Sequence, residues 1–283
     1  MVRFHEFIKS KEAGEPHFMV IGHPIGHSLS PLMHSIALEA HSIDAQYLAV
    51  DLDPGDTDRF ISWINKDAFL GANVTIPYKR EFLQVVDRLD DTAAAVGALN
   101  TIVKESESVT GYNTDVDGFL HPLKPWFDRL EGESVIVFGT GGAASAVIYA
   151  LDQLGVEQIV QVSRHPGRLD TGEEILCNYQ NWQAYAEESV MLVNCTPLGM
   201  HPATEKSPVS EHDTHLLAGK VCYDLVYNPL QTTFLKQAGQ AGAETIGGLM
   251  MFISQGARAF ELWTGKAFPE KKILKALEKK FRS

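Results

Sequence analysis

The sequence predicts an α/β protein made of two domains, and three observations support this fold class. Short apolar runs alternate with helix-like stretches along all 283 residues, as in sheets whose strands are joined by helices. A glycine-rich turn follows an apolar run at 135–144, near the middle of the chain, where a second domain would begin. The length is also sufficient for two domains of ordinary size.

The first half of the chain predicts a parallel or mixed sheet in a three-layer α/β domain. Strand-like runs lie at 18–21, 47–50, 72–75 and 101–103, and a return run at 109–112 is expected to add an antiparallel strand. Helical patterns separate them at 31–40, 56–64 and 77–86. Pro31 and Pro77 begin two of these helices, at a position where the missing N–H is tolerated.

The second half predicts a parallel sheet of doubly wound order. After a helix that starts near residue 116, strands are expected at 135–138, 158–163, 190–195, 221–226 and 244–246. The last helices, at 249–263 and 271–280, are expected to pack back onto the first domain. The predicted domains are therefore residues 1–115 with 249–283, and residues 116–248.

The turn at 139–144 has the spacing G-x-G-x-x-A between a strand and a helix. Gly139 permits a tight turn, Gly141 lets the backbone approach a pyrophosphate, and the helix offers its positive end to phosphate. We therefore expect a Rossmann-type domain that binds a dinucleotide. A glycine turn with a purely structural role is the alternative.

The end of the next strand indicates which dinucleotide is bound. An NAD site normally has Asp or Glu there, but this chain reads Ser163-Arg164-His165-Pro-Gly-Arg168. Guanidinium groups suit the 2′-phosphate of NADP, so NADP is the expected cofactor. For Arg168, a solvated loop arginine stays an alternative.

Composition excludes several classes of partner. The formal net charge is −12, which argues against a nucleic-acid or anionic-membrane surface. Cys177, Cys195 and Cys222 are too widely spaced for a zinc cluster or a disulfide framework. The cysteine usage fits a reducing cytoplasm, and because no long apolar run occurs we expect a soluble protein. The expected dinucleotide would carry the redox chemistry, so no metal is required.

Two hydroxyls precede the first predicted helix, in His27-Ser28-Leu29-Ser30-Pro31. Ser30 alone would serve as the helix N-cap, which is the structural interpretation. Ser28 would then be an unexplained second hydroxyl, and together the two serines could bind a carboxylate.

Lys79 falls in the first turn of the helix predicted at 77–86. A cation there is unfavourable by about 0.3–1 kcal/mol, and such a local violation indicates function, here as a proton donor and acceptor. For the neighbouring Arg80, the alternative interpretation is a solvated side chain on the surface.

Residues 113–118 have the spacing of the start of a calcium loop, with Asp115 at its third position. The twelfth position is Lys124, where an EF-hand needs a bidentate Glu, so calcium is not expected. A favourable interaction with a helix dipole is the structural alternative for Asp115 and Asp117.

A series of motifs then identifies a family. They are Ser-Leu-Ser-Pro (28–31), Asn-Val-Thr-Ile-Pro-Tyr-Lys (73–79), Gly-Ala-Leu-Asn-Thr (97–101), Gly-Tyr-Asn-Thr-Asp (111–115), Asn-Cys-Thr-Pro-Leu-Gly-Met (194–200), Tyr-Asn-Pro (227–229) and Gly-Leu-Met-Met-Phe-Ile-Ser-Gln (248–255). This set resembles the shikimate dehydrogenase family over almost the whole chain.

The resemblance implies a two-domain enzyme that reversibly reduces 3-dehydroshikimate to shikimate with NADPH, in the chorismate route to aromatic amino acids. It implies that Lys79 and Asp115 form a catalytic pair. The substrate-binding residues that it implies are Ser28, Ser30 and Tyr227 for the carboxylate, and Asn73, Thr75, Asn100, Asp115 and Gln255 for the ring hydroxyls, with Lys79 beside them.

The resemblance also implies cofactor-binding residues. These are Gly139, Thr140, Gly141, Gly142 and Ala143 at the pyrophosphate, Ser163, Arg164 and Arg168 at the adenosine phosphate, and Leu225 and Gly248 at the nicotinamide. The family commonly has Asn and Thr where this chain has Ser163 and His165. We expect a monomer or homodimer whose partners are small molecules.

Two alternative functions stay open. One is an NAD-preferring quinate/shikimate dehydrogenase, against which Arg164 without an acidic neighbour and the serines at both hydroxyl positions of Ser28-Leu29-Ser30 weigh. The other is a non-catalytic relative that senses shikimate-like molecules, for which retention of both Lys79 and Asp115 would be unexplained.

Overall fold

The computed structural model describes residues 1–106, 108–166 and 175–282. The chain divides into two compact units, Met1–Thr114 with Gln255–Ser283, and Asp115–Ser254. Residue 115 and residues 249–254, which the sequence analysis assigned to the first domain, group with the second unit.

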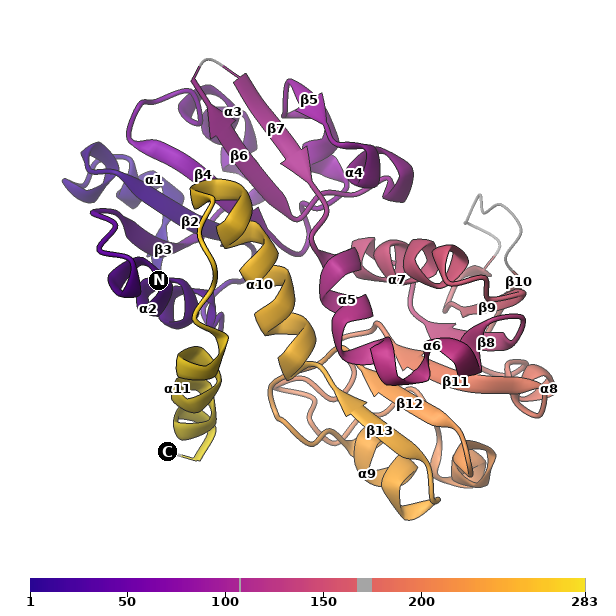
Figure 1. Ribbon diagram of the computed structural model, residues 1–283. Helices are drawn as coiled ribbons and strands as arrows, with labels where there is room; N and C mark the ends of the chain where they lie inside the picture. The colour runs from indigo at the N-terminus through magenta and orange to yellow at the C-terminus, as the bar shows by residue number, and fades with distance from the viewer. Residues whose placement is uncertain (107, 167–174, 283) are drawn as a thin grey trace. The chain divides into compact units, whose positions relative to one another are not determined.

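The first unit is built on a mixed seven-stranded sheet of order β1-β3-β2-β4-β6-β7-β5. β1 to β4 are mutually parallel, β6 is antiparallel to both β4 and β7, and Figure 1 shows β6 and β7 side by side. The strands are β1 (Val2–Arg3), β2 (His17–Gly22), β3 (Gln46–Asp51), β4 (Phe69–Val74), β5 (Arg88–Leu89), β6 (Thr101–Glu105) and β7 (Ser108–Tyr112). The expected mixed sheet is confirmed.

Helices cover both faces of this sheet. They are α1 (Phe4–Phe7), α2 (Ser30–Ala40), α3 (Thr57–Trp63), α4 (Asp91–Val96), the part of α10 (Leu249–Thr264) from residue 255 onward, and α11 (Glu270–Arg282). Alternate residues of β2 and β4, such as Met19 and Ala72, pack with Phe4 and Phe60 of α1 and α3. The three-layer prediction is confirmed.

The opposite face carries α2 and α10. The register pairs Phe18 with Gly71, and Phe18 packs against the Trp263 ring at 4.8 Å between centroids. A Cβ on Gly71 would lie 2.5 Å from the Trp263 Nε1, so glycine is needed for this approach. Trp263 Nε1 also donates to the Ile102 carbonyl at 2.9 Å, which joins α10 to β6.

α11 packs on α2, so the last helix belongs to the first unit, as the sequence led us to expect. Contacts join the two helices, and Lys272 Nζ lies 3.7 Å from a Glu39 carboxylate oxygen.

The helix predicted at 77–86 is wrong. The chain instead makes successive turns after β4 and then a short 3₁₀ helix, η3 (Glu81–Gln84). The Lys79 carbonyl, which a helix would pair with residue 83, accepts the N–H of Leu99 at 2.8 Å. Tyr78 is fully buried and its hydroxyl donates to the Leu52 carbonyl. Long-range hydrogen bonds therefore replace the local helical ones.

The second unit contains a fully parallel six-stranded sheet of order β10-β9-β8-β11-β12-β13. Its strands are β8 (Ser134–Phe138), β9 (Gln158–Val162), β10 (Ile175–Cys177), β11 (Ser189–Asn194), β12 (Val221–Asp224) and β13 (Glu244–Gly247). This is the expected doubly wound order, in which strands are added first on one side of β8 and then, from β11 onward, on the other. Ligands of such sheets bind at the carboxyl ends of the strands near that reversal.

Helices lie on both faces of this sheet as well. They are α5 (Asp115–Leu123), α6 (Phe127–Leu130), α7 (Gly142–Gln153), α8 (Gln183–Ala186) and α9 (Thr233–Gln240). α5 packs on α7 and stacks Phe119 on Tyr223 at 5.0 Å. α9 covers the other face, where Phe234 joins the cluster of Ile136 and Phe138.

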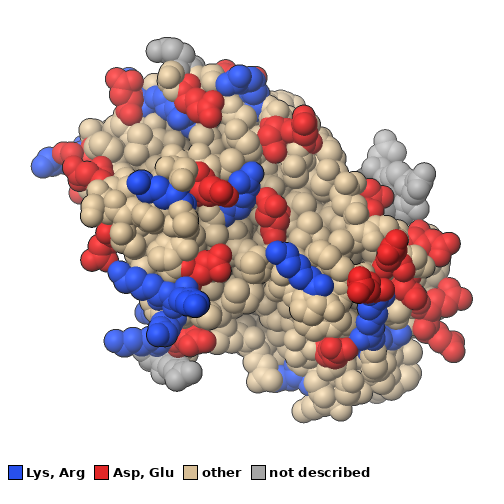
Figure 2. Space-filling model, viewed as in Figure 1, with Lys and Arg blue, Asp and Glu red and all other residues tan. Residues whose placement is uncertain are grey.

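Charged side chains of both signs are interspersed over the face shown in Figure 2. Among the residues that the structure describes, no helix is long and apolar enough to cross a membrane.

Candidate active site

A buried network of amides and hydroxyls lies in the first unit, where β4, β6 and β7 meet. Asn73 is 6% exposed and Asn100 is 3% exposed. Asn73 Nδ2 donates to Thr101 Oγ1 at 3.1 Å, and Asn100 Nδ2 donates to Thr114 Oγ1 at 3.0 Å. The hydroxyls of Thr101 and Thr114 are 3.2 Å apart. Two predicted substrate-binding amides therefore belong to one network.

A backbone group fixes the orientation of the Asn100 amide in this network. The Thr114 N–H can only donate, and it lies 2.7 Å from Asn100 Oδ1. Asn100 Oδ1 must therefore face Thr114 N, and the Thr101 hydroxyl donates to the same oxygen at 3.1 Å. Such a satisfied buried network holds its members in one arrangement.

Main-chain hydrogen bonds join three of the motifs that the sequence analysis singled out. Val74 N–H donates to the Asn100 carbonyl at 2.8 Å, and Leu99 N–H donates to the Lys79 carbonyl at the same distance. Asn100 N–H donates to the Tyr112 carbonyl at 3.0 Å. Lys79 is half-buried and follows Thr75, itself half-buried, in the turn after β4.

The two serines at the start of α2 are not arranged as expected if Ser30 were the N-cap residue. Leu29 occupies the N-cap position of α2, and Ser30 is already the first helical residue, 6% exposed. The Ser28 hydroxyl accepts the Ser30 N–H at 3.3 Å. The N-cap interpretation of Ser30 is therefore wrong, while Ser28 and Ser30 do flank the start of one helix.

Asp115 is the first residue of α5 and is 5% exposed, whereas Asp117 is exposed. Gln255 lies within α10 and is half-buried. In the described ranges, no group of three or more His, Cys, Asp or Glu side chains is placed to hold a metal ion.

The glycine turn of the second unit has the geometry that a phosphate site needs. Gly139 has φ of +114°, in the region that favours glycine, and a Cβ there would lie 3.2 Å from the Cys195 carbonyl carbon. Gly141 is the N-cap of the 12-residue helix α7, and a Cβ on it would meet open space. Thr140, Gly142 and Ala143 surround it and are half-buried. A pyrophosphate fits at this helix N-terminus, where backbone N–H groups lack helical partners.

The loop after β9 presents an arginine. Ser163 is buried, and its hydroxyl accepts the His165 N–H at 3.0 Å, which turns the chain so that Arg164 is exposed. Burial raises the pKa of Tyr179, and the nearby positive charge of Arg164 partly offsets that rise. Arg168 lies outside the described residues.

Leu225 and Gly248 lie against each other at the carboxyl ends of β12 and β13. A Cβ on Gly248 would overlap the Leu225 carbonyl, so only glycine permits this approach. Two residues further along, Tyr227 stacks on Phe252 of α10 at 4.2 Å between centroids.

Asp224 is a buried residue of this region that the sequence analysis missed. Its carboxylate accepts from Asn194 Nδ2 at 2.9 Å, Val226 N–H at 3.0 Å and the Thr232 hydroxyl at 2.6 Å. Burial raises its pKa to about 6. Asp224 thus links the loops after β11 and β12 through its hydrogen bonds. In the sequence, the feature that could have revealed it is a single carboxylate at the end of an apolar strand.

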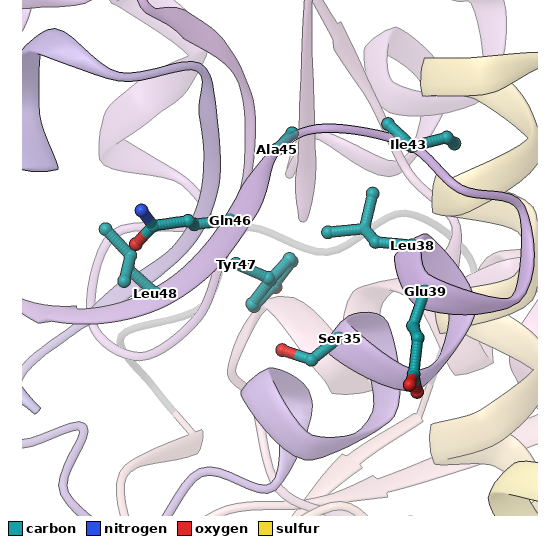
Figure 3. A pocket seen from close by; sticks show the side chains of 8 residues that line it. All are labelled: Ser35, Leu38, Glu39, Ile43, Ala45, Gln46, Tyr47 and Leu48. Atoms are coloured by element: carbon teal, nitrogen blue, oxygen red, sulfur yellow. The ribbon is translucent and has the colours of Figure 1, made fainter.

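An open hollow also occurs on the first unit, between the end of α2 and the start of β3 (Figure 3). None of its lining residues belongs to the predicted site. They are Ser35, Leu38, Glu39, Ile43, Ala45, Gln46, Tyr47 and Leu48.

Comparisons with known proteins identify the family of this chain. Residues 20–102 match the family model of the shikimate dehydrogenase substrate binding domain, and residues 248–278 match that of the shikimate 5'-dehydrogenase C-terminal domain. The chain is 39% identical to the shikimate dehydrogenase (NADP(+)) of Moorella thermoacetica, with 88% of each chain covered.

Solved structures show the same fold. The shikimate 5-dehydrogenase of Thermus thermophilus, solved in complex with NADP(H) and shikimate, has a TM-score of 0.81 at 33% identity, covering 93% of this chain and 99% of that one. The quinate dehydrogenase of Corynebacterium glutamicum in complex with NAD has a TM-score of 0.83 at 26% identity, covering 94% and 99%. With its fold, its motifs and its extensive identity to these relatives, the chain belongs to the shikimate dehydrogenase family.

Proposed function

We propose that this protein catalyses the reversible NADPH-dependent reduction of 3-dehydroshikimate to shikimate, a step toward aromatic amino acids. The observation that carries the proposal is the joining of the 73–79, 97–101 and 111–115 motifs by main-chain hydrogen bonds. This arrangement gathers two oriented amides and the segment bearing Lys79 in one place. A polyhydroxylated ring is the kind of ligand that such a set of donors and acceptors recognises.

On the substrate side, each residue has a proposed role. The hydroxyls of Ser28 and Ser30, with Tyr227, bind the carboxylate. The ring hydroxyls are bound by Asn73, Thr75, Asn100, Asp115 and Gln255. Burial of Asn73 and Asn100 supports this role, because buried amides lose little entropy when they bind a ligand.

On the cofactor side, the turn from Gly139 to Ala143 holds the pyrophosphate, and Ser163, Arg164 and Arg168 hold the adenosine phosphate. Leu225 and Gly248 hold the nicotinamide through their backbone groups. NADPH, when bound, supplies the hydride for the ketone carbon. The geometry of the glycine turn and the exposed Arg164 guanidinium support NADP as the cofactor.

The protein's own chemistry in this reaction is a proton transfer. Reduction of a ketone places negative charge on its oxygen, and the Lys79 ammonium donates the proton that this oxygen requires. Asp115 orients and stabilises that ammonium. In the reverse direction, Lys79 takes the proton from the shikimate hydroxyl.

These roles divide between the two predicted domains, except that Tyr227, proposed to bind the substrate, belongs to the second. Residues 1–115 with 249–283 form the substrate-binding and catalytic domain, and residues 116–248 form the NADP-binding domain.

The test is a spectrophotometric assay of the purified protein with shikimate or quinate, each against NADP or NAD. Shikimate with NADP is expected to give the highest kcat/KM. A preference for quinate with NAD would establish the alternative dehydrogenase activity. If the protein bound shikimate but turned over no combination of substrate and cofactor, it would instead be a sensor.

A further inference from the structure

Tyr47 contacts the predicted substrate-binding amide Asn73 from two strands away. The register of β2 pairs Phe18 with Tyr47 and Val20 with Asn73, so the side chains of Tyr47 and Asn73 leave the same face of the sheet. Tyr47 is 4% exposed, and its hydroxyl donates to Asn73 Oδ1 at 2.6 Å. No motif of the sequence analysis included Tyr47.

Asn100 fixes the orientation of the Asn73 amide, and Tyr47 holds its oxygen side. The main-chain carbonyl of Asn100 can only accept, and it lies 3.4 Å from Asn73 Nδ2. The NH₂ group must therefore face Asn100 and Thr101, and the oxygen must face Tyr47. One N–H of Asn73 makes only this long contact with Asn100, so it is the donor most readily offered to a ligand oxygen.

The Tyr47 ring is itself held in place. It stacks on the buried His34 of α2 with centroids 4.4 Å apart and an interplanar angle of 13°. Burial lowers the pKa of His34 to about 3, so this partner is neutral at physiological pH. Figure 3 shows Tyr47 reaching from the strand toward α2 beside Ser35 and Leu38.

We propose that Tyr47 is a positioning residue that makes Asn73 a hydrogen-bond donor toward the substrate. The inference rests on the proposed function and adds a residue to it. Without the Tyr47 hydroxyl, Asn73 Oδ1 loses that donor, and the amide is held from its NH₂ side alone, by the Asn100 carbonyl and the Thr101 hydroxyl. The amide can then turn away from the position in which it donates to a ligand oxygen, which weakens ground-state binding rather than the chemical step.

The first test is Tyr47→Phe, which keeps the ring and its stacking on His34. The KM for shikimate is expected to rise by about 5- to 20-fold, as for loss of a hydrogen bond that fixes a buried amide. Changes in kcat and in the KM for NADP should stay within about twofold. The matched control is Tyr223→Phe, which removes a buried hydroxyl that has no hydrogen-bond partner within the described residues.

The second test is a double-mutant cycle with Asn73→Ala. If Tyr47 acts through Asn73, Tyr47→Phe should cause no further rise in KM once the amide is absent. An equal rise in both backgrounds would overturn the proposal. So would a Tyr47→Phe variant with the KM of the wild type.

Thr101→Val gives an independent route if circular dichroism shows that Tyr47→Phe does not fold. This near-isosteric change removes the acceptor on the other side of the Asn73 amide and also the hydroxyl that donates to Asn100 Oδ1, so the part of its effect that is coupled to Asn73→Ala is the part that tests the proposal. Its KM for shikimate should rise and should likewise be coupled to Asn73→Ala, and an unchanged KM would overturn the proposal. Failure of the wild-type protein to turn over shikimate would instead contradict the proposed function itself.

Discussion

Lys79 is positioned by tertiary hydrogen bonds and not by a helix. Its carbonyl accepts the Leu99 N–H, and the residue before it is buried. The helix-dipole argument for its function therefore no longer applies. What supports its proposed role is its place in a turn that is hydrogen-bonded to the Asn100 segment.

Replacing Lys79 separates catalysis from binding. Lys79→Ala is expected to lower kcat by about 10²- to 10⁴-fold with a much smaller change in the KM for shikimate, because the ammonium acts on charge that develops in the transition state. Arg80→Ala removes the adjacent exposed cation and is the control. Steady-state kinetics of both variants measure kcat and KM. A near-normal kcat for Lys79→Ala would show that Lys79 does not transfer the proton and is a binding or surface residue.

Asp224 predicts a pH dependence of stability. Its pKa is about 6 in the folded protein against an ordinary value of 3.8, because burial disfavours the charged form. The folded protein therefore binds this proton more tightly than the unfolded chain does. The contribution of Asp224 to the free energy of unfolding falls as pH rises from about 4 to about 6, by on the order of 1–3 kcal/mol.

The Asp224→Asn variant has no titratable group at this position, so its free energy of unfolding should not show this decrease between about pH 4 and pH 6. Urea unfolding between pH 4 and 8 should show the wild-type stability decreasing relative to the variant up to about pH 6, with a constant difference above pH 7. Asp152→Asn, at an exposed aspartate of the same unit, is the control. A difference between wild type and Asp224→Asn that does not change with pH would contradict the burial argument.

Among the elements, the loop after the carboxyl end of β9 is the one that we propose to select the cofactor. The Ser163 hydroxyl makes the turn that exposes Arg164, by accepting the His165 N–H. A hydroxyl can accept a backbone N–H two residues on, as an asparagine side chain also does. The departure from the family's common Asn at this position therefore preserves the local turn.

Arg164→Ala is expected to weaken NADP binding by about 1.5–3 kcal/mol, which is the range for a charge-assisted hydrogen bond to phosphate. NAD lacks the 2′-phosphate and is the internal control, so its dissociation constant should change little. Fluorescence titration of both cofactors measures the effect. If both weaken equally, Arg164 does not bind the phosphate.

At the scale of the whole molecule, the chain has a separate apolar cluster in each unit. Phe4, Phe60 and Phe82 belong to one cluster, and Phe138 and Phe234 belong to the other. Two cores of this kind allow the units to unfold at different temperatures.

Calorimetry is therefore expected to show unfolding that departs from two-state behaviour. NADP at 100 times its dissociation constant should stabilise the transition of the second unit by about 2.7 kcal/mol and raise its Tm. The Tm of the first unit should rise less. A single transition with equal calorimetric and van't Hoff enthalpies, with or without NADP, would contradict independent unfolding.

Most of the regular elements, and the connectivity of the second unit, could be predicted from the amino-acid sequence. Apolar runs followed by G-x-G-x-x-A give a strand, a turn and a helix through local dihedral and packing preferences alone. The sequence also held signals that the analysis missed. Asp90 caps α4 by accepting the Ala93 N–H at 2.9 Å, and Gly97 ends it with φ of +65°, both common marks of helix ends.

The conformation of the segment after β4 and the orientation of the buried amides depend on long-range contacts that the sequence pattern does not reveal. Local periodicity favoured a helix at 77–86, but the Lys79 carbonyl pairs with Leu99 and the Tyr78 hydroxyl with Leu52. Likewise, Asn73 is a family motif residue in the sequence, while its direction depends on Tyr47, 26 positions away. The physical reason is common to both. Local preferences amount to about 1 kcal/mol per residue or less, whereas an unsatisfied buried polar group costs about 1–3 kcal/mol, so the long-range partners prevail.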